Sequence, residues 1–494
     1  MLGLRTGIAS SNLVKTISPR MRHMTRHATI RSAALAAALG AAVLGFAEDQ
    51  TDPALSAGDF TIKRADAEAF AEPAPVLTYK QQQPFMRGRS HFNQKWVIFP
   101  SMGGAWGLGP TFIADKCSAC HIGAGRGMMP KTDEEPVGVL IRMSIPGTNE
   151  HGGPKPHPAY GDQFQNQGLT GKDAYNHGVG DRVPPEGTVY IDWDEIGVVE
   201  FSDGEKVTLR KPKPRFDKLT FGPLGEETML SLRFTPPIFG MGLLEAVPEE
   251  TLLGIAKKQA EQGFSGRPNT VWDPYTKQSR MGRFGWKANA PTIRVQIAFA
   301  YLGDIGATTS MLIEDNCTSV QSLCLASTPN NRPEVVDSDW DEIEFWTLGL
   351  AVPARRNVDD ADFKRGEALF NEAKCSVCHV TTMKTAEEFK PLPQLANQIF
   401  HAYTDLLLHD MGEGLSDGRP DFQAQPTEWR TPPLWGLGLS EIVTGSKSML
   451  HDGRANNAIE AILWHGGEAQ VSRDAFRKMT KVDRDALLKF LNSI

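Results

Sequence analysis

Two copies of the pentapeptide Cys-x-x-Cys-His stand far apart in this chain, as CSACH at 117–121 and CSVCH at 375–379. In each copy, two thiols can add to the two vinyl groups of a haem, and the adjacent imidazole can bind the iron. A redox dithiol or half of a zinc site would need only the two cysteines, without the final histidine. The sequence therefore predicts two covalently bound haems c, held by Cys117, Cys120 and His121 and by Cys375, Cys378 and His379.

The N-terminus has the pattern of an export signal. Residues 1–47 contain six basic residues and no acid, and they end in an apolar run of small side chains before Glu48. This pattern is typical of a secretory signal peptide, and the run is short for a membrane span. We expect a periplasmic protein without stable membrane insertion after cleavage, which agrees with the extracytoplasmic maturation of c-type haems. An uncleaved anchor is the alternative.

The charge and the remaining cysteines fit this compartment. The formal net charge of −7 becomes about −13 once the six basic residues of the signal are removed. Nucleic acid is therefore not expected as a partner, whereas a small basic redox protein could be steered to this surface as an electron donor. Cys317 and Cys324 are expected to form a local disulfide, with a reactive dithiol as the alternative.

The elements that must position the two motifs indicate a mainly α fold with two cytochrome c-like haem domains. We expect an N-terminal haem domain at 48–336, with a β-rich insertion at about 136–240, and a C-terminal cytochrome c domain at 337–494. Alternation of apolar and polar residues around Asp203 and Gly204 predicts a hairpin. The segment EETLLGIAKKQAEQG predicts a helix that ends near Gly263, and Gly366 would allow two helices to cross closely.

Several longer segments carry a family resemblance. They are GPTFIADKCSACHIGAGRG and LRFTPPIFGMGLLEAVPEE in the first half, and YTDLLLHDMGEGLSDG, EWRTPPLWGLG and LHDGRANNAIEAILWHGGEA in the second. Together they resemble the di-haem oxidoreductase family of peroxidases, also labelled thiol oxidoreductases, over nearly the whole mature chain. More distantly, the chain is similar to bacterial di-haem cytochrome c peroxidases and to the methylamine-utilisation di-haem enzyme.

The resemblance implies roles for residues of the second half. The residues outside the motifs that could bind iron in the second half are His409, His451, His465, Met411 and Met449. The resemblance places the distal iron ligand of the C-terminal haem at His465, and Trp286 of GWKANAPT between the two haems. A surface histidine and an ordinary core tryptophan are the alternatives. His409 and His451 are expected to bond propionates or backbone groups. Thr431 and Pro433 resemble a segment that helps to hold calcium, which is therefore a further implied cofactor.

The N-terminal haem has no evident distal ligand in the sequence. His151, His157 and His177 lie in the insertion and are expected to be loop residues. An open iron position could bind peroxide, and cleavage of its O–O bond would need an acid or base and a polar partner. Glu245, Gln296 and Asp304 are the candidates, with structural roles as the alternative for each.

These observations favour an exported di-haem oxidoreductase that acts as a peroxidase. In this hypothesis, the C-terminal haem accepts electrons, Trp286 relays them, and peroxide is reduced at the N-terminal haem. One alternative is an electron-transfer cytochrome without a substrate of its own, and another is a high-valent haem oxygenase acting on an organic or protein substrate. Thiol redox chemistry is disfavoured, because haem attachment would use the motif cysteines.

Overall fold

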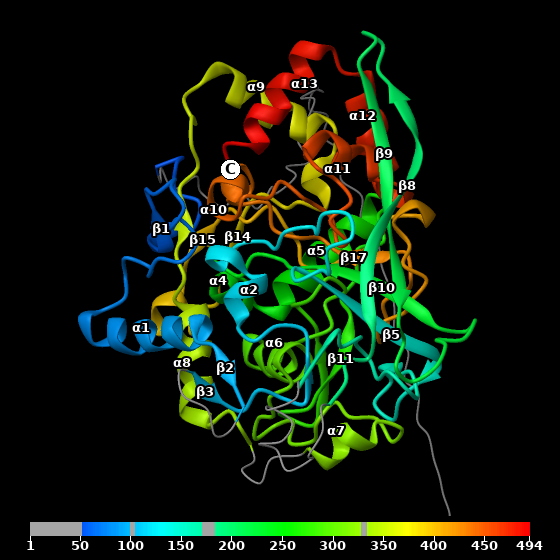
Figure 1. Ribbon diagram of the computed structural model, residues 1–494. Coiled ribbons are helices and arrows are strands. Elements are labelled where there is room, and N and C mark those ends of the chain that lie inside the picture. Colours follow the sequence, from blue (N-terminus) through cyan, green and yellow to red (C-terminus); the bar gives the residue numbers. More distant parts are fainter. Residues whose placement is uncertain (1–51, 99–103, 170–182, 328–332) are drawn as a thin grey trace, which may run out of the picture. The chain divides into compact units, whose positions relative to one another are not determined.

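Figure 1 shows a computed structural model of the chain, which describes residues 52–98, 104–169, 183–327 and 333–494. Residues Gln50–Ile494 form one compact unit. The predicted signal peptide at 1–47 and His177 lie outside the described residues. None of the helices in the described ranges is long and apolar enough to cross a membrane.

The prediction of a mainly α fold is wrong. Helices make up only 31% of the structure and strands make up 20%. Apart from one sheet of three strands, the described sheets contain two strands each. Sequence reasoning gave most weight to the helices around the two motifs and missed short strands that pair distant loops, such as β16 (Leu408–Asp410) with β17 (Glu428–Arg430). The division into two haem domains at residue 337 stays a prediction.

The described helices and strands have the following bounds, with the labels of Figure 1. The helices are α1 (Tyr79–Asn93), α2 (Cys117–Cys120), α4 (Met241–Glu245), α5 (Glu249–Glu261), α6 (Ile293–Ala300), α7 (Ser322–Ala326), α8 (Asp337–Leu348), α9 (Ala361–Glu372), α10 (Ser440–Thr444), α11 (Ala458–Trp464), α12 (Gln470–Lys478) and α13 (Lys481–Leu491). The longer strands are β5 (Val139–Thr148), β8 (Thr188–Glu200), β9 (Lys206–Asp217), β10 (Met229–Phe234), β11 (Thr270–Asp273) and β12 (Gln278–Met281). The remaining short strands are β1 (Thr61–Ile62), β2 (Trp96–Val97), β3 (Ala105–Trp106), β4 (Thr111–Phe112), β6 (Pro154–Lys155), β7 (Gln167–Gly168), β13 (Val352–Pro353), β14 (Met383–Lys384) and β15 (Ile399–Phe400).

Two pairs of helices cross at glycines, and each pair includes the helix that precedes a Cys-x-x-Cys-His motif. Helix α1 packs on α8, and α9 packs on α13, as both views show. A Cβ atom on Gly88 of α1 would lie 2.1 Å from the carbonyl oxygen of Glu342, and one on Gly366 of α9 would lie 2.1 Å from that of Ala486. Only glycine allows these backbones to approach so closely. The crossing expected at Gly366 is therefore present, and a second one of the same kind precedes the first motif.

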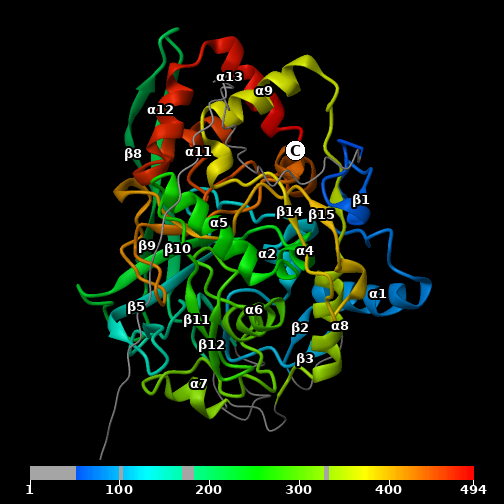
Figure 2. The same ribbon diagram turned by 180° about the vertical axis from the view of Figure 1, so that it is seen from behind.

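The long hairpin β8–β9 forms around Asp203 and Gly204, as the alternation of apolar and polar residues predicts. It extends along helices α12 and α13 of the C-terminal segment (Figures 1 and 2). Phe201 is buried there, with its ring edge against Phe476 at a centroid distance of 5.8 Å. The Arg484 guanidinium of α13 donates to Asp203 at 2.5 Å and to Glu205 at 2.8 Å. The hairpin thus fastens the region of the first motif to the region of the second.

Two smaller predictions are also confirmed. Cys317 forms a disulfide with Cys324 of helix α7. The segment EETLLGIAKKQAEQG forms α5, and Gly263 follows its end with a φ of 85°, a backbone conformation that suits glycine.

Candidate active site

The first Cys-x-x-Cys-His motif lies on α2 and beside a cavity that we call the N-terminal cavity. His121 lines this cavity, and its Nδ1 donates a hydrogen bond to the carbonyl oxygen of Pro236 at 2.9 Å. Burial lowers the pKa of His121 to about 4, so the ring is neutral near pH 7. A neutral imidazole with Nδ1 engaged keeps its Nε2 free, which is the arrangement that binds metal.

The second motif repeats this arrangement beside a second cavity, which we call the C-terminal cavity. Nδ1 of His379 donates to the carbonyl oxygen of Tyr403 at 2.9 Å, and burial lowers the pKa of His379 to about 4. Phe370 of α9 lies beside His379 at a ring-centroid distance of 6.4 Å, and Phe92 of α1 lies beside His121 at 6.2 Å. Both histidines are therefore held in the state that suits iron ligation.

The four motif cysteines carry free thiols and line the two cavities. Burial raises the pKa of Cys117 and of Cys375 to about 12, and it also raises the pKa of Cys120 and of Cys378. A reactive dithiol instead needs a depressed thiol pKa. These sites thus fit a haem held through its vinyl groups, and they do not fit thiol redox chemistry.

Trp286 stands in the wall between the two cavities. The residues that line both cavities are Arg126, Trp286, Arg430 and Pro432. The Trp286 indole is 7% exposed and donates from Nε1 to the carbonyl oxygen of Phe234 at 2.7 Å. Its own carbonyl oxygen accepts from the backbone N–H of Arg430 at 2.9 Å. The side chain is fixed at the position that an electron relay would need, and the relay role itself stays a prediction.

Two of the three candidate catalytic residues lie in the N-terminal cavity. Gln296 of α6 lines it, and in the described part of the chain no group binds its side-chain amide. Asp304 also lines the cavity and accepts from Nε2 of Gln163 at 2.8 Å, and burial raises its pKa. The negative charge of Asp304 also raises the pKa of Cys117 and of Cys120 in the first motif.

Glu245 has a different position. Its carboxylate accepts from the backbone N–H of Ile293 at 2.6 Å, at the first residue of α6, and it is not among the residues that line the cavity. Burial raises the pKa of Glu245 to about 7. The structure therefore gives Glu245 a role at the helix terminus, and its predicted catalytic role has no support from its position.

The C-terminal cavity is rich in groups that can bind iron. His465 follows the end of α11 and lines the cavity, as do Met411 and Met449. Nδ1 of His465 donates to the carbonyl oxygen of Ala461 at 2.7 Å, which leaves Nε2 free. Burial lowers the pKa of His465. A positive charge on His465 would in turn lower the pKa of His379, which indicates that the two rings lie near each other. His465 is thus a neutral imidazole in the same cavity as His379, and its role as the second iron ligand stays a prediction.

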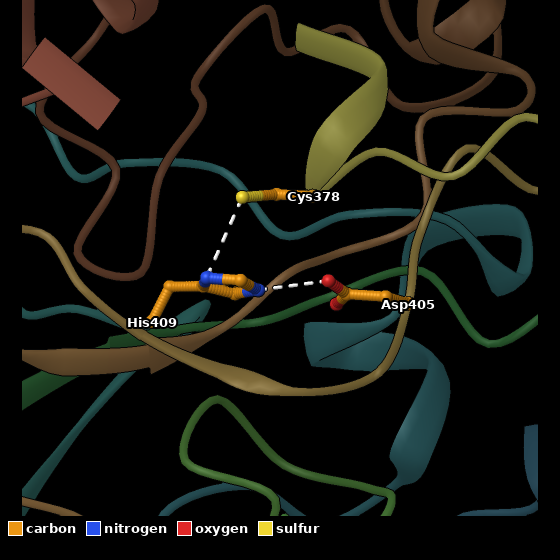
Figure 3. A group of neighbouring side chains, drawn as sticks. All are labelled: Cys378, Asp405 and His409. Atoms are coloured by element: carbon orange, nitrogen blue, oxygen red, sulfur yellow. Dashed lines mark hydrogen bonds and ion pairs between the residues drawn. The ribbon is translucent and has the colours of Figure 1, made fainter. Parts of the chain in front are cut away.

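His409 lies between charged and polar partners beside Cys378 (Figure 3). Its Nε2 contacts Asp405 at 2.7 Å, and its Nδ1 contacts Glu468 at 3.1 Å and Sγ of Cys378 at 3.4 Å. Burial opposes a charge on this ring, but the Asp405 carboxylate and the other partners outweigh it and raise the pKa of His409. An imidazolium with both nitrogens engaged is a poor metal ligand.

The same group is the only trio of histidine, cysteine and acidic residues in the described ranges that could hold a metal ion. It comprises Cys378, Asp405 and His409. Because Cys378 would be a thioether in a haem-loaded protein, it could not serve there as a thiolate ligand. The trio is better explained as an ion pair that fixes the loop beside the attachment cysteine. That His409 bonds a propionate stays a prediction.

The ring of His451 also packs against an aromatic and a basic side chain. Its ring lies on that of Trp429 at a centroid distance of 3.5 Å and an angle of 10°. The Lys287 amino group lies 4.3 Å from the centre of the same indole, which favours a cation–π contact. Burial lowers the pKa of His451 well below its usual value. His451 lines the C-terminal cavity as a neutral ring, and its predicted bond to a propionate remains a prediction.

The calcium prediction gains little from the geometry. The carbonyl oxygen of Thr431 already accepts from the Thr404 hydroxyl at 2.6 Å and from the Arg430 guanidinium at 3.3 Å, and Pro433 lines the N-terminal cavity.

The described histidines that the sequence places in loops do not line either cavity. His151 stacks on Trp272, and His157 bonds the carbonyl oxygen of Leu224.

Sequence reasoning missed the polar residues that the fold brings to the cavities from unremarkable segments. Arg126 comes from the glycine-rich GAGRGMMP, and Arg430 comes from strand β17. The buried hydroxyl of Tyr301 lines the N-terminal cavity, and no described residue forms a hydrogen bond with it. The sequence contains no local signal for these roles, because each depends on where the loops meet.

Comparison with known proteins assigns the chain to a family. Searches of curated proteins and of solved structures returned no significant match. The family model described as "Di-haem oxidoreductase, putative peroxidase" matches residues 51–494, which include both motifs and every residue that lines the two cavities. The chain therefore belongs to the di-haem oxidoreductase family, and it is an oxidoreductase with two haems.

Proposed function

We propose that this chain is an exported peroxidase with two covalently attached haems, which reduces peroxide at the N-terminal site with electrons received at the C-terminal site. Haem supplies the redox chemistry and a binding position for peroxide. The chain supplies the attachment thiols, Cys117 with Cys120 and Cys375 with Cys378. It also supplies His121 and His379, whose engaged Nδ1 atoms leave Nε2 free for iron.

The observation that carries this proposal is the difference between the cavity walls. The C-terminal cavity contains His465, Met411 and Met449 in addition to His379. Among the described residues that line the N-terminal cavity, His121 is the only histidine, and Met241 is the only methionine. Protein ligands on both sides of a haem suit electron transfer, whereas an open side suits a small substrate. The two sites are thus equipped for different tasks.

In the N-terminal cavity, the chain can bind and orient a small polar substrate. The free amide of Gln296 projects from α6 among the apolar side chains of Ile293, Ile297 and Phe299. A hydrogen-bond donor in such a low-dielectric wall interacts strongly with a charge that develops on a substrate oxygen. Asp304 can hold a proton at its carboxyl group, because burial raises its pKa. These two residues are the proposed polar partner and proton carrier.

Electron supply would use the wall between the cavities. Trp286 is fixed there by hydrogen bonds to Phe234 and Arg430. An exported chain with a net charge of about −13 would attract a small basic redox protein as the donor.

Peroxide consumption by the haem-loaded protein with a reduced artificial donor tests the proposed activity. We expect turnover by the wild type, and a decrease in kcat/KM for peroxide of about 100-fold in Gln296→Ala, since one donor to a developing charge is removed. Gln470→Ala, in the exposed first turn of α12, is the matched control and should retain wild-type turnover. A fully loaded and reducible protein that consumes no peroxide would be an electron carrier and not a peroxidase.

Export is tested separately. The periplasmic fraction should contain a chain whose N-terminus is Glu48 and whose mass includes both haems. An intact chain that begins at Met1 and sediments with membranes would instead support an uncleaved anchor.

A further inference from the structure

Two buried arginines stand in the wall between the cavities, and neither forms a hydrogen bond or an ion pair with a described carboxylate. Arg126 is 6% exposed, Arg430 is 7% exposed, and both side chains line both cavities. Nε of Arg126 is buried without a hydrogen-bond acceptor, and no described carboxylate forms an ion pair with this side chain. Arg430 donates only to neutral carbonyl oxygens, those of Gly285 at 2.8 Å and Thr431 at 3.3 Å.

Other arginines of the N-terminal cavity do have acidic partners. Arg142 donates to Asp162 at 2.8 Å, and Arg233 lies 3.4 Å from Asp417. The protein thus neutralises the guanidinium groups that face the cavity elsewhere, and the two in the shared wall are exceptions. Burial lowers the pKa of Arg126 and of Arg430 to about 10, so both still carry a positive charge at neutral pH.

A buried charge without a directly bound counter-charge is strongly unfavourable. The charge of the Asp405 carboxylate raises the pKa of Arg430, but Asp405 forms no ion pair with it, so both guanidinium groups still lack a directly bound anion. Each haem brings two propionate carboxylates, and the planar fork of an arginine matches a carboxylate with two parallel hydrogen bonds. Because both side chains face both cavities, they are placed to meet carboxylates from either side.

We propose that Arg126 and Arg430 form one anion site that binds propionates of both haems and raises the redox potential of both. The proposal rests on the presence of two haems and not on peroxide reduction. A nearby positive charge favours the reduced state of a haem, because reduction adds an electron. Neutralising either arginine should therefore lower both potentials together.

Redox titration of the haem-loaded protein, followed by visible absorbance, tests this site. In Arg126→Gln and in Arg430→Gln, we expect the ratio of reduced to oxidised haem at a fixed potential to fall about tenfold for both haems, which corresponds to 59 mV for a one-electron couple. Arg365→Gln removes an equal charge from the exposed surface of α9 and should leave both potentials unchanged.

Three further results decide the outcome. Arg126→Lys and Arg430→Lys keep the charge without the fork, so both potentials should fall by less than in the glutamine variants. A fall in the lysine variants as large as in the glutamine variants would overturn the role of the charge. The wild-type titration below carries the test if a glutamine variant fails to load haem. Titration of the wild type at low and high phosphate, at constant ionic strength, should give the same potentials, whereas a phosphate-dependent shift would identify a free anion in this site. A response of only one haem, or of neither, would also overturn the shared site. Loss of peroxide turnover alone would leave these titrations unaffected.

Discussion

The two Cys-x-x-Cys-His regions are alike on the side of the histidine that would bind iron and unlike on the opposite side. Each is preceded by a helix that crosses another at a glycine, Gly88 or Gly366, with the same 2.1 Å approach for an added Cβ. Each histidine donates from Nδ1 to a backbone carbonyl at 2.9 Å. The opposite walls then diverge, because only the C-terminal cavity contains a second histidine with a free nitrogen near the first, His465.

Different parts of the chain form the surroundings of the two motif histidines and the cavity walls opposite them. The local fold around each motif is repeated, so it does not distinguish the two sites. The distinction depends on side chains that come from other segments, such as Gln296 on α6 and His465 after α11. Function in such a protein has to be argued from the wall that faces the motif.

The largest expected effect comes from removing the proposed second ligand of the C-terminal site. His465→Ala should abolish the low-spin signal of that site in the optical and electron paramagnetic resonance spectra, because an axial nitrogen is lost. His401→Ala is the control, because His401 is a histidine of the chain's C-terminal part that does not line the cavity. An unchanged low-spin signal in His465→Ala would transfer the ligand role to Met411 or Met449.

The hairpin that links the two regions should be the next most sensitive element. Phe201→Ala removes a ring that is 3% exposed and packs on Phe476, and we expect it to lower the free energy of unfolding by about 3–5 kcal/mol. Val198→Ala, at a position of β8 that is 60% exposed, should change it by less than about 0.5 kcal/mol. Equal effects in urea denaturation would mean that the hairpin tip does not fasten the two regions.

The shared state of His121 and His379 predicts a pH dependence of stability. Both pKa values are lowered to about 4 in the folded chain, against about 6.5 when unfolded. The unfolded state therefore binds more protons between these values, and stability is retained above about pH 6.5 and lost as the pH falls toward 4. The loss is about 3 kcal/mol for each imidazole. Urea unfolding of the haem-free chain across this range checks the slope, because iron binding would occupy both rings. A pH-independent stability of the haem-free chain would contradict the buried neutral rings.

The two glycine crossings should respond equally to substitution. Gly88→Ala and Gly366→Ala each force a Cβ toward a backbone oxygen, and overpacking of this kind costs about 1–3 kcal/mol. Gly254→Ala, in α5 with no atom near its Cβ position, should instead stabilise the protein by about 0.5–1 kcal/mol. Thermal unfolding of the three variants measures the difference. An unchanged stability in Gly88→Ala would mean that the two helix crossings are not equivalent.

Much of the site could be predicted from the sequence where a local pattern encodes the chemistry. The two motifs predict the two haems that the family match supports. The alternation around Asp203 and Gly204 predicts the hairpin, and the two remaining cysteines pair as expected. The balance of helix and strand was wrong, because short strands such as β16 and β17 depend on contacts between distant loops.

The arginines of the shared wall could not be predicted for the same reason. Nothing in the residues around Arg126 or Arg430 marks a buried cation, and only the meeting of the two cavities gives these side chains a common role. Glu245 is the opposite case. Its segment resembles the family, but its carboxylate accepts a hydrogen bond from the backbone N–H of Ile293 and does not line the cavity, so its catalytic role stays a prediction.

Electron paramagnetic resonance of the haem-loaded protein, oxidised and half-reduced, tests most directly whether the two sites differ in coordination. The account predicts a low-spin signal from the C-terminal site and a high-spin signal from the N-terminal site in at least one of these states. Two low-spin signals in both states would contradict it, because neither site would then have an open position for peroxide.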